Sequence, residues 1–151
     1  GQPPLIGWRS LRDESKADLN ASAPFHTDSR RFEVATSCVP LLAGLRRSLE
    51  LLDQEGSAEQ RLAHIRRHSS ALWQALQNID GITTLLSAPP TSGLVSFQIN
   101  GESNPADWVQ RLGQEGVWIR DLADPSCLRA CTHVCTTTAD IDQLIQKLAR
   151  N

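Results

Sequence analysis

The stretch GVWIRDLADPSCLRACTHVC, residues 116–135, decides how this chain folds. It contains two apolar segments, 117–121 and 127–135, separated by a polar stretch with a proline. Short segments rich in β-branched or apolar residues and bounded by Gly, Pro, Asn or Asp are typical of β-strands. Two more segments of this kind, 82–86 and 93–99, precede them. The sequence therefore predicts four strands.

Helical periodicity marks the remaining segments. Between residues 38 and 52, and again between 57 and 79, apolar residues recur at the spacing of one helix face, and a glycine follows each segment. Two more helices are expected at 104–116 and 138–149. The order ααββαββα predicts an α+β fold, with about four helices on one face of a small, mainly antiparallel sheet. A doubly wound parallel sheet is disfavoured.

The first thirty residues show no sustained periodicity and carry several prolines and polar side chains. An irregular segment of this length is unusual inside a compact domain. We therefore expect residues 1–30 to form a connector arm that lies on another part of a longer chain or on a partner subunit. Residues 31–151 are expected to form the domain itself.

The composition excludes several classes of function. A net charge of −2, from 15 basic and 17 acidic side chains, offers no basic surface for nucleic acid or anionic lipid. No apolar run approaches the roughly 18 residues that span a bilayer, and the first residues do not resemble a signal peptide. The chain is therefore expected to be cytoplasmic, and its four cysteines to be reduced thiols.

The densest group of reactive side chains is Cys127, Cys131, His133 and Cys135. In an extended segment the last three would point to one face, in steps of two residues. Zinc requires four converging ligands, and the closely spaced cysteine pair at a turn that is typical of zinc sites is missing. Buried apolar cysteines are therefore favoured, and no metal is expected.

Arg129 stands between apolar and small residues of an expected core strand. A guanidinium in this place needs an anionic partner or an open cleft. Because its two parallel donors match a carboxylate, Arg129 is a candidate clamp for the α-carboxylate of an amino acid. The alternative is an internal salt bridge with a helix carboxylate. For Arg120, a salt bridge with the adjacent Asp121 is favoured.

Several stretches resemble one enzyme family. RFEVAT, at residues 31–36, resembles the RFE-x-G-T segment that opens the small domain of class V aminotransferases, which include cysteine desulfurases and isopenicillin-N-epimerase-like proteins. The stretches at 93–97, 116–120 and 128–130, with the helix that follows, reproduce the family's order of strands and helix. Residues 31–148 are thus similar to the C-terminal small domain of a fold type I pyridoxal-phosphate (PLP) enzyme.

This resemblance implies roles for three residues. Arg129 matches the arginine that holds the substrate carboxylate. Thr36 matches the threonine that reaches the cofactor phosphate of the neighbouring subunit in a homodimer, although Ala35 replaces the family's glycine before it. Gly7-Trp8 resembles the segment where the chain leaves the large domain, which implies that Trp8 lines the entrance to the site.

The resemblance also ranks the reactions. Cysteine desulfurases carry a nucleophilic cysteine on a loop before the strand of the carboxylate arginine, but here only residues 121–126 separate Arg120 from Cys127. This short connection looks more like the cysteine/cystine C–S lyases. The implied activity is a PLP-dependent C–S lyase acting on cysteine or cystine. The alternatives are a class V aminotransferase, an epimerase, a desulfurase-like enzyme, or a free-standing interaction module without enzymatic activity.

PLP chemistry requires a lysine that forms a Schiff base with the cofactor. The chain has two lysines, Lys16 in the polar arm and Lys147, expected on the outward side of the last helix. Neither is expected in a cofactor pocket, and in the family this lysine belongs to the large domain. Catalysis is therefore expected of the intact protein and not of this chain alone, to which no catalytic residue is assigned.

Overall fold

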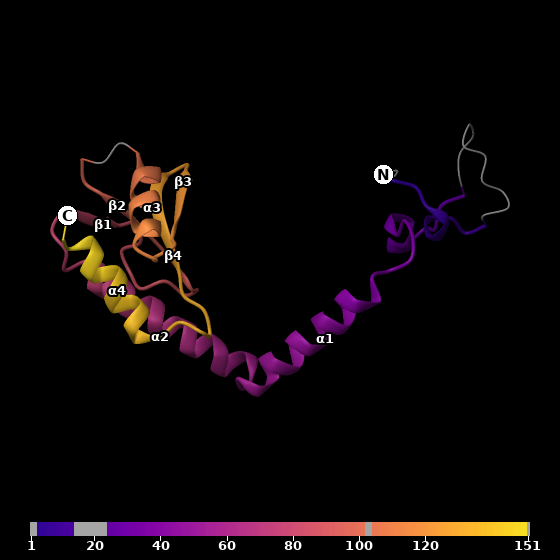
Figure 1. The fold of residues 1–151 in the computed structure, drawn as a ribbon, viewed down its shortest axis with the longest axis horizontal. Coiled ribbons are helices and arrows are strands. Elements are labelled where there is room, and N and C mark those ends of the chain that lie inside the picture. Colours follow the sequence, from indigo (N-terminus) through magenta and orange to yellow (C-terminus); the bar gives the residue numbers. More distant parts are fainter. Residues whose placement is uncertain (1–2, 14–23, 102–103, 151) are drawn as a thin grey trace. The chain divides into compact units, whose positions relative to one another are not determined.

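The structure is a computed structural model that describes residues 3–13, 24–101 and 104–150. The chain divides into two compact units, Gly1–Glu50 and Leu51–Asn151. The elements follow in the order η1 (Trp8–Ser10), η3 (Ser29–Phe32), α1 (Val39–Gln54), α2 (Ala58–Leu76), β1 (Ile82–Thr84), β2 (Leu94–Ile99), α3 (Pro105–Gln114), β3 (Arg120–Ala123), β4 (Ser126–Cys131) and α4 (Thr138–Leu148) (Figure 1). The predicted α+β fold and its element order are confirmed.

The second unit is built on a four-stranded sheet with the strand order β1-β2-β4-β3. Every neighbouring pair is antiparallel. Strands β3 and β4 are joined by a turn of two residues, because Ala123 pairs with Ser126. Strands β2 and β4 each have a paired strand on both sides and form the interior of the sheet.

One face of this sheet carries the hydrophobic core. Successive residues of a strand point to opposite faces, so each strand supplies alternate side chains to the core. The buried cluster joins these side chains to apolar residues of three helices: Val95 and Phe97 from β2, Leu128 and Ala130 from β4, Leu72 and Leu76 from α2, Trp108 and Leu112 from α3, and Ile141, Leu144 and Leu148 from α4. Helix α1 supplies none, so three helices rather than about four form the core with the sheet.

Side-chain caps explain where two of these helices begin. The Ser57 hydroxyl accepts a hydrogen bond from the Gln60 N–H at 3.3 Å, and the Gln60 side chain accepts one from the Ser57 N–H at 2.8 Å. Thr137 and Asp140 form the same reciprocal arrangement at the start of α4. Each cap pairs N–H groups that have no partner within the helix itself. None of the described helices has both the length and the apolar character needed to cross a membrane.

Two predicted strands differ from the observed ones. The strand predicted at 117–121 begins only at Arg120, because the Val117 N–H donates to the Leu112 carbonyl at 2.9 Å and closes the end of α3. The strand predicted at 127–135 ends at Cys131, because a turn follows in which the Thr136 N–H donates to the His133 carbonyl at 3.0 Å. His133 and Cys135 therefore do not continue the strand face of Cys131.

The described residues of the first unit are more ordered than an irregular arm. The segments on either side of residues 14–23 meet at an isolated antiparallel bridge between Leu11 and Phe25. The His26 N–H donates to the Ser10 carbonyl at 3.0 Å, and the Arg12 N–H donates to the Pro24 carbonyl at 2.8 Å. This compact unit extends from Gly1 to Glu50. The role of residues 1–30 as a connector stays a prediction.

Candidate functional site

The sheet face opposite the core carries the polar and charged residues of the interior strands. On β4, Leu128 and Ala130 belong to the core, so Arg129 points to the other face. On β2, Ser96 lies between the buried Val95 and Phe97 and also points to this face. We call this the outer face of the sheet.

Arg129 stands in the middle of a row across the outer face. The strand register places it directly opposite Ser96 on β2 and opposite Arg120 on β3. Its side chain is half-buried, yet within the described part of the chain its guanidinium has no hydrogen bond or ion pair. The internal salt bridge considered from the sequence is therefore absent from these residues. Arg129 lies on an interior strand, so the face of the sheet presents it rather than an edge.

Arg120 adds a second guanidinium to the same row. Sequence reasoning paired it with Asp121, but neighbouring residues of a strand point to opposite faces, and the described residues contain no ion pair between the two. Like charges directly opposite each other on paired strands repel. An anion bound to the outer face would relieve this repulsion, so the two arginines together form a candidate anion site.

This second arginine could have been found from the sequence. Arg120 lies four residues before Asp124, and Arg129 lies four residues after Pro125. If Asp124 and Pro125 form the two-residue turn of a hairpin, the two arginines must be cross-strand partners. With strands placed at 117–121 and 127–135, as the apolar residues suggest, the two arginines do not fall opposite each other.

Cys127 lies on the outer face but is closed to solvent. Its exposure is 1%, and Leu122 of β3 is its neighbour in the sheet. Burial raises the pKa of the Cys127 thiol, and the Arg129 charge and a hydrogen bond with Ser96 oppose this only in part. Since the thiolate is the nucleophilic form, Cys127 is a poor nucleophile in this environment.

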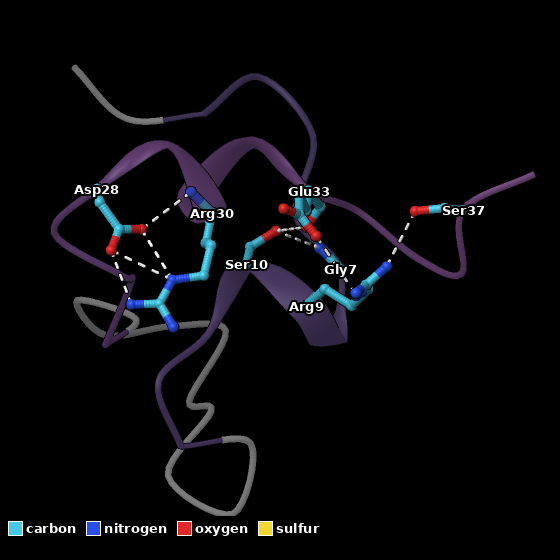
Figure 2. A network of polar contacts seen from close by, with 7 residues as sticks. All are labelled: Gly7, Arg9, Ser10, Asp28, Arg30, Glu33 and Ser37. Carbon is cyan, nitrogen blue, oxygen red and sulfur yellow. Dashed lines mark hydrogen bonds and ion pairs between the residues drawn. The ribbon is translucent and has the colours of Figure 1, made fainter. Parts of the chain in front are cut away.

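The first unit holds its two segments together through a polar network around Ser10 (Figure 2). The Ser10 side chain is fully buried. Its hydroxyl donates to the Glu33 carbonyl at 2.6 Å and accepts a hydrogen bond from the Gly7 N–H at 3.2 Å. Arg9 contacts the Glu33 carboxylate at 3.4 Å and donates to the Ser37 hydroxyl at 3.0 Å. Sequence reasoning missed this network.

The network brings together the segments of two predicted site residues. Trp8 lies in η1 next to Arg9, and its side chain is 53% exposed. Thr36 lies on the segment that Arg9 and Ser10 contact, and it is exposed. Its hydroxyl makes no hydrogen bond with any residue that the structure describes. Arg129 belongs to the other compact unit, so the structure does not place it relative to Trp8 and Thr36.

The lysines and cysteines give further limits. Lys16 lies outside the described residues. The side chain of Lys147 is only 15% exposed and its Nζ lies 2.6 Å from the Glu115 carboxylate, so the expected outward position is wrong. All four cysteines are free thiols. Residues 3–13, 24–101 and 104–150 contain no group of three or more His, Cys, Asp or Glu side chains that could hold a metal ion.

The family model described as "Aminotransferase class-V" matches residues 12–144 of the chain. This match covers most of the first unit and nearly all of the second. No curated protein sequence matches the chain.

Solved structures with the same fold are known. The chain is 35% identical to the cystine C–S lyase C-DES, with a TM-score of 0.82 to the complex with its reaction product, cysteine persulfide; the match covers 97% of this chain and 38% of that one. A lysine-to-alanine variant of C-DES, with glycine covalently linked to its PLP cofactor, matches with 35% identity, a TM-score of 0.83, and 97% and 37% coverage. The Escherichia coli cysteine desulfurase CsdA shows the fold at 22% identity, with a TM-score of 0.77; the match covers 99% of this chain and 38% of that one.

The chain thus spans less than two fifths of the length of these proteins. The family match extends over well over half of the chain, and the α+β fold with its antiparallel sheet agrees with it. The chain belongs to the aminotransferase class-V family.

Proposed function

We propose that this chain is the C-terminal small domain of a PLP-dependent enzyme that acts on an amino acid, and that residues 1–30 connect it to a cofactor-binding domain. The observation that carries the proposal is the half-buried guanidinium of Arg129, which has no partner among the described residues and faces away from the core. A group in this state is suited to bind an anion that arrives with the substrate.

In the proposed site, Arg129 holds the α-carboxylate of the substrate. Its planar fork donates two parallel hydrogen bonds and thereby fixes the orientation of the carboxylate as well as its position. Arg120, its cross-strand neighbour, supplies a second positive charge. A substrate with two carboxylates, such as cystine, matches this pair of charges better than a monocarboxylate does. Ser96, on the other side of Arg129, offers a hydroxyl to the same face.

The residues present fit a PLP site that is completed by another domain. Thr36 has an exposed hydroxyl that is available to a phosphate oxygen. Lys147 is engaged with Glu115, so among the described residues no lysine is available for the Schiff base, and the proposal places that lysine in the cofactor-binding domain. PLP, when bound, supplies the electron sink that stabilises negative charge at the substrate α-carbon. Trp8, largely exposed, is proposed to line the entrance.

The proposed reaction is C–S bond cleavage in cystine or cysteine. With cystine, the bond between the β-carbon and sulfur breaks, and cystine and water yield pyruvate, ammonia and cysteine persulfide. A desulfurase mechanism requires a mobile nucleophilic cysteine instead. Here the turn between β3 and β4 has only two residues, and the nearest thiol, that of Cys127, is buried and has a raised pKa. These features favour the lyase.

The proposal includes a homodimer and a cytoplasmic location. In a homodimer, Thr36 would serve the cofactor of the neighbouring subunit, which accounts for an exposed hydroxyl on a segment that the first unit holds firmly. The four free thiols are consistent with a reducing compartment.

The full-length protein, reconstituted with PLP and incubated with cystine, tests the reaction. We expect pyruvate and ammonia to form in equal amounts, with one sulfane sulfur for each pyruvate. Exchange of the amino group with an added keto acid without pyruvate would show an aminotransferase. In a parallel incubation with cysteine, alanine together with a persulfide on an enzyme thiol would show a desulfurase. A full-length protein that binds no PLP would leave the interaction module as the remaining alternative.

A further inference from the structure

Ser10 has the properties of a residue that fixes a backbone path. It is fully buried in a unit where most side chains are exposed. Its hydroxyl bridges two segments that are 23 residues apart in sequence, because it donates to the Glu33 carbonyl and accepts from the Gly7 N–H. Loss of the hydroxyl would remove this partner from both backbone groups and weaken the link between the two segments.

Arg9 acts on the same segment from the exposed side. Its guanidinium reaches both the carboxylate of Glu33 and the hydroxyl of Ser37. These two residues flank Thr36 and lie within three positions of it. Because the Arg9 guanidinium contacts both Glu33 and Ser37, it limits how far the residues between them can move. Figure 2 shows Arg9 and Ser10 directed toward the 33–37 segment from η1.

Gly7 brings the two segments into backbone contact. A Cβ atom at position 7 would overlap the carbonyl oxygen of Val34, so only glycine permits this approach. The same N–H of Gly7 is held by Ser10. Residues 7–10 and 33–37 are therefore joined by backbone contact, a buried hydroxyl and a guanidinium, and none of these contacts uses the Thr36 hydroxyl.

We propose that Arg9 and Ser10 are positioning residues that hold the 33–37 segment in the conformation in which Thr36 binds the cofactor phosphate. This inference rests on the proposed function, because it assumes the PLP contact of Thr36. It assigns to the predicted connector an active part in cofactor binding, through residues that do not themselves contact the cofactor. Arg9 and Ser10 thereby raise the affinity for PLP without adding a ligand to it.

The test is the dissociation constant of PLP from the full-length protein, measured by titrating the cofactor-free form and following the absorbance of the lysine-bound cofactor. Ser10→Ala and Arg9→Ala are each expected to weaken PLP binding by about tenfold. This is the loss expected when the hydrogen bond between the Thr36 hydroxyl and the cofactor phosphate is no longer held in place. Ser29→Ala and Arg12→Ala are the matched controls, because these exposed side chains make no hydrogen bond or ion pair with the 33–37 segment. The controls are expected to bind PLP like the wild type.

A double-mutant cycle separates positioning from general stability. In a Thr36→Val background, Ser10→Ala and Arg9→Ala should have little further effect on the PLP dissociation constant, because the group they position is gone. Additive losses would overturn the inference, as would unchanged PLP binding in both single variants. Arg9→Ala leaves no buried group unpaired, so it remains informative if Ser10→Ala fails to fold. Failure of the wild-type protein to bind PLP would instead refute the proposed function.

Discussion

Replacing Arg120 by glutamine should stabilise the folded chain, although it removes a proposed substrate contact. Arg120 and Arg129 are direct cross-strand partners on the outer face, and the described residues provide no carboxylate that pairs with either. Favourable cross-strand pairs contribute roughly 0.2–1 kcal/mol, and we take the repulsion between like charges to be of similar size. The Arg120→Gln variant should therefore gain about 0.5 kcal/mol in the free energy of unfolding, or roughly 2–4 °C in melting temperature for a unit of this size.

Urea unfolding at low and high salt tests this prediction. At about 10 mM salt the two charges are unscreened, whereas at about 1 M the screening length falls to roughly 3 Å and the gain should vanish. Arg12→Gln removes an exposed arginine whose side chain has no hydrogen bond or ion pair among the described residues, and it should show no such salt-dependent gain. A variant at position 120 that is less stable than the wild type, or equally stabilised at both salt concentrations, would refute the argument that the two guanidinium groups repel.

Three further predictions concern the second unit. In the folded chain, iodoacetamide should leave Cys127 unmodified while the other three thiols react, because burial shields this thiol and raises its pKa; equal modification of all four would contradict this. Leu76→Ala should lower the free energy of unfolding by about 2–5 kcal/mol, because Leu76 is fully buried in the core, and urea denaturation measures the loss. Hydrogen bonds from the Thr137 backbone and side chain lower the pKa of Asp140 below its ordinary value of 3.8. The charged carboxylate therefore stabilises the fold above that pH. This contribution is lost as the pH falls through the lowered pKa. The melting temperature of Asp140→Asn should accordingly fall less than that of the wild type between about pH 6 and pH 2.5, and parallel curves would argue against the cap.

Much of the fold could be predicted because local patterns and tertiary packing agree in the second unit. The alternation of apolar residues in β2 and β4 matches the face that the core buries, and the glycines and the Ser57 cap lie where the helices end or begin. The failures lie where a single hydrogen bond or ion pair decides the outcome. Val117 has strand-forming character, but its N–H completes α3 and delays the strand to Arg120.

The candidate site was predicted only in part, for the same reason. Arg129 stood out because a charge in an apolar strand is unusual, whereas Arg120 becomes its partner only when residues 124–125 are taken as the turn of a hairpin. Lys147 was expected on the outward side of the last helix, and no sequence pattern marks its partner, Glu115, which follows the end of another helix. Ser10 carries no sequence signal at all, since its role depends on a carbonyl 23 residues away.

Arg129 is the group proposed to bind the substrate carboxylate. The value of kcat/KM for cystine in the full-length Arg129→Gln variant tests this role most directly. We predict a loss of about tenfold to roughly a hundredfold, the cost of a charge-assisted pair of hydrogen bonds, with PLP affinity and melting temperature close to those of the wild type. An unchanged kcat/KM for cystine in a variant that folds and binds PLP would contradict it.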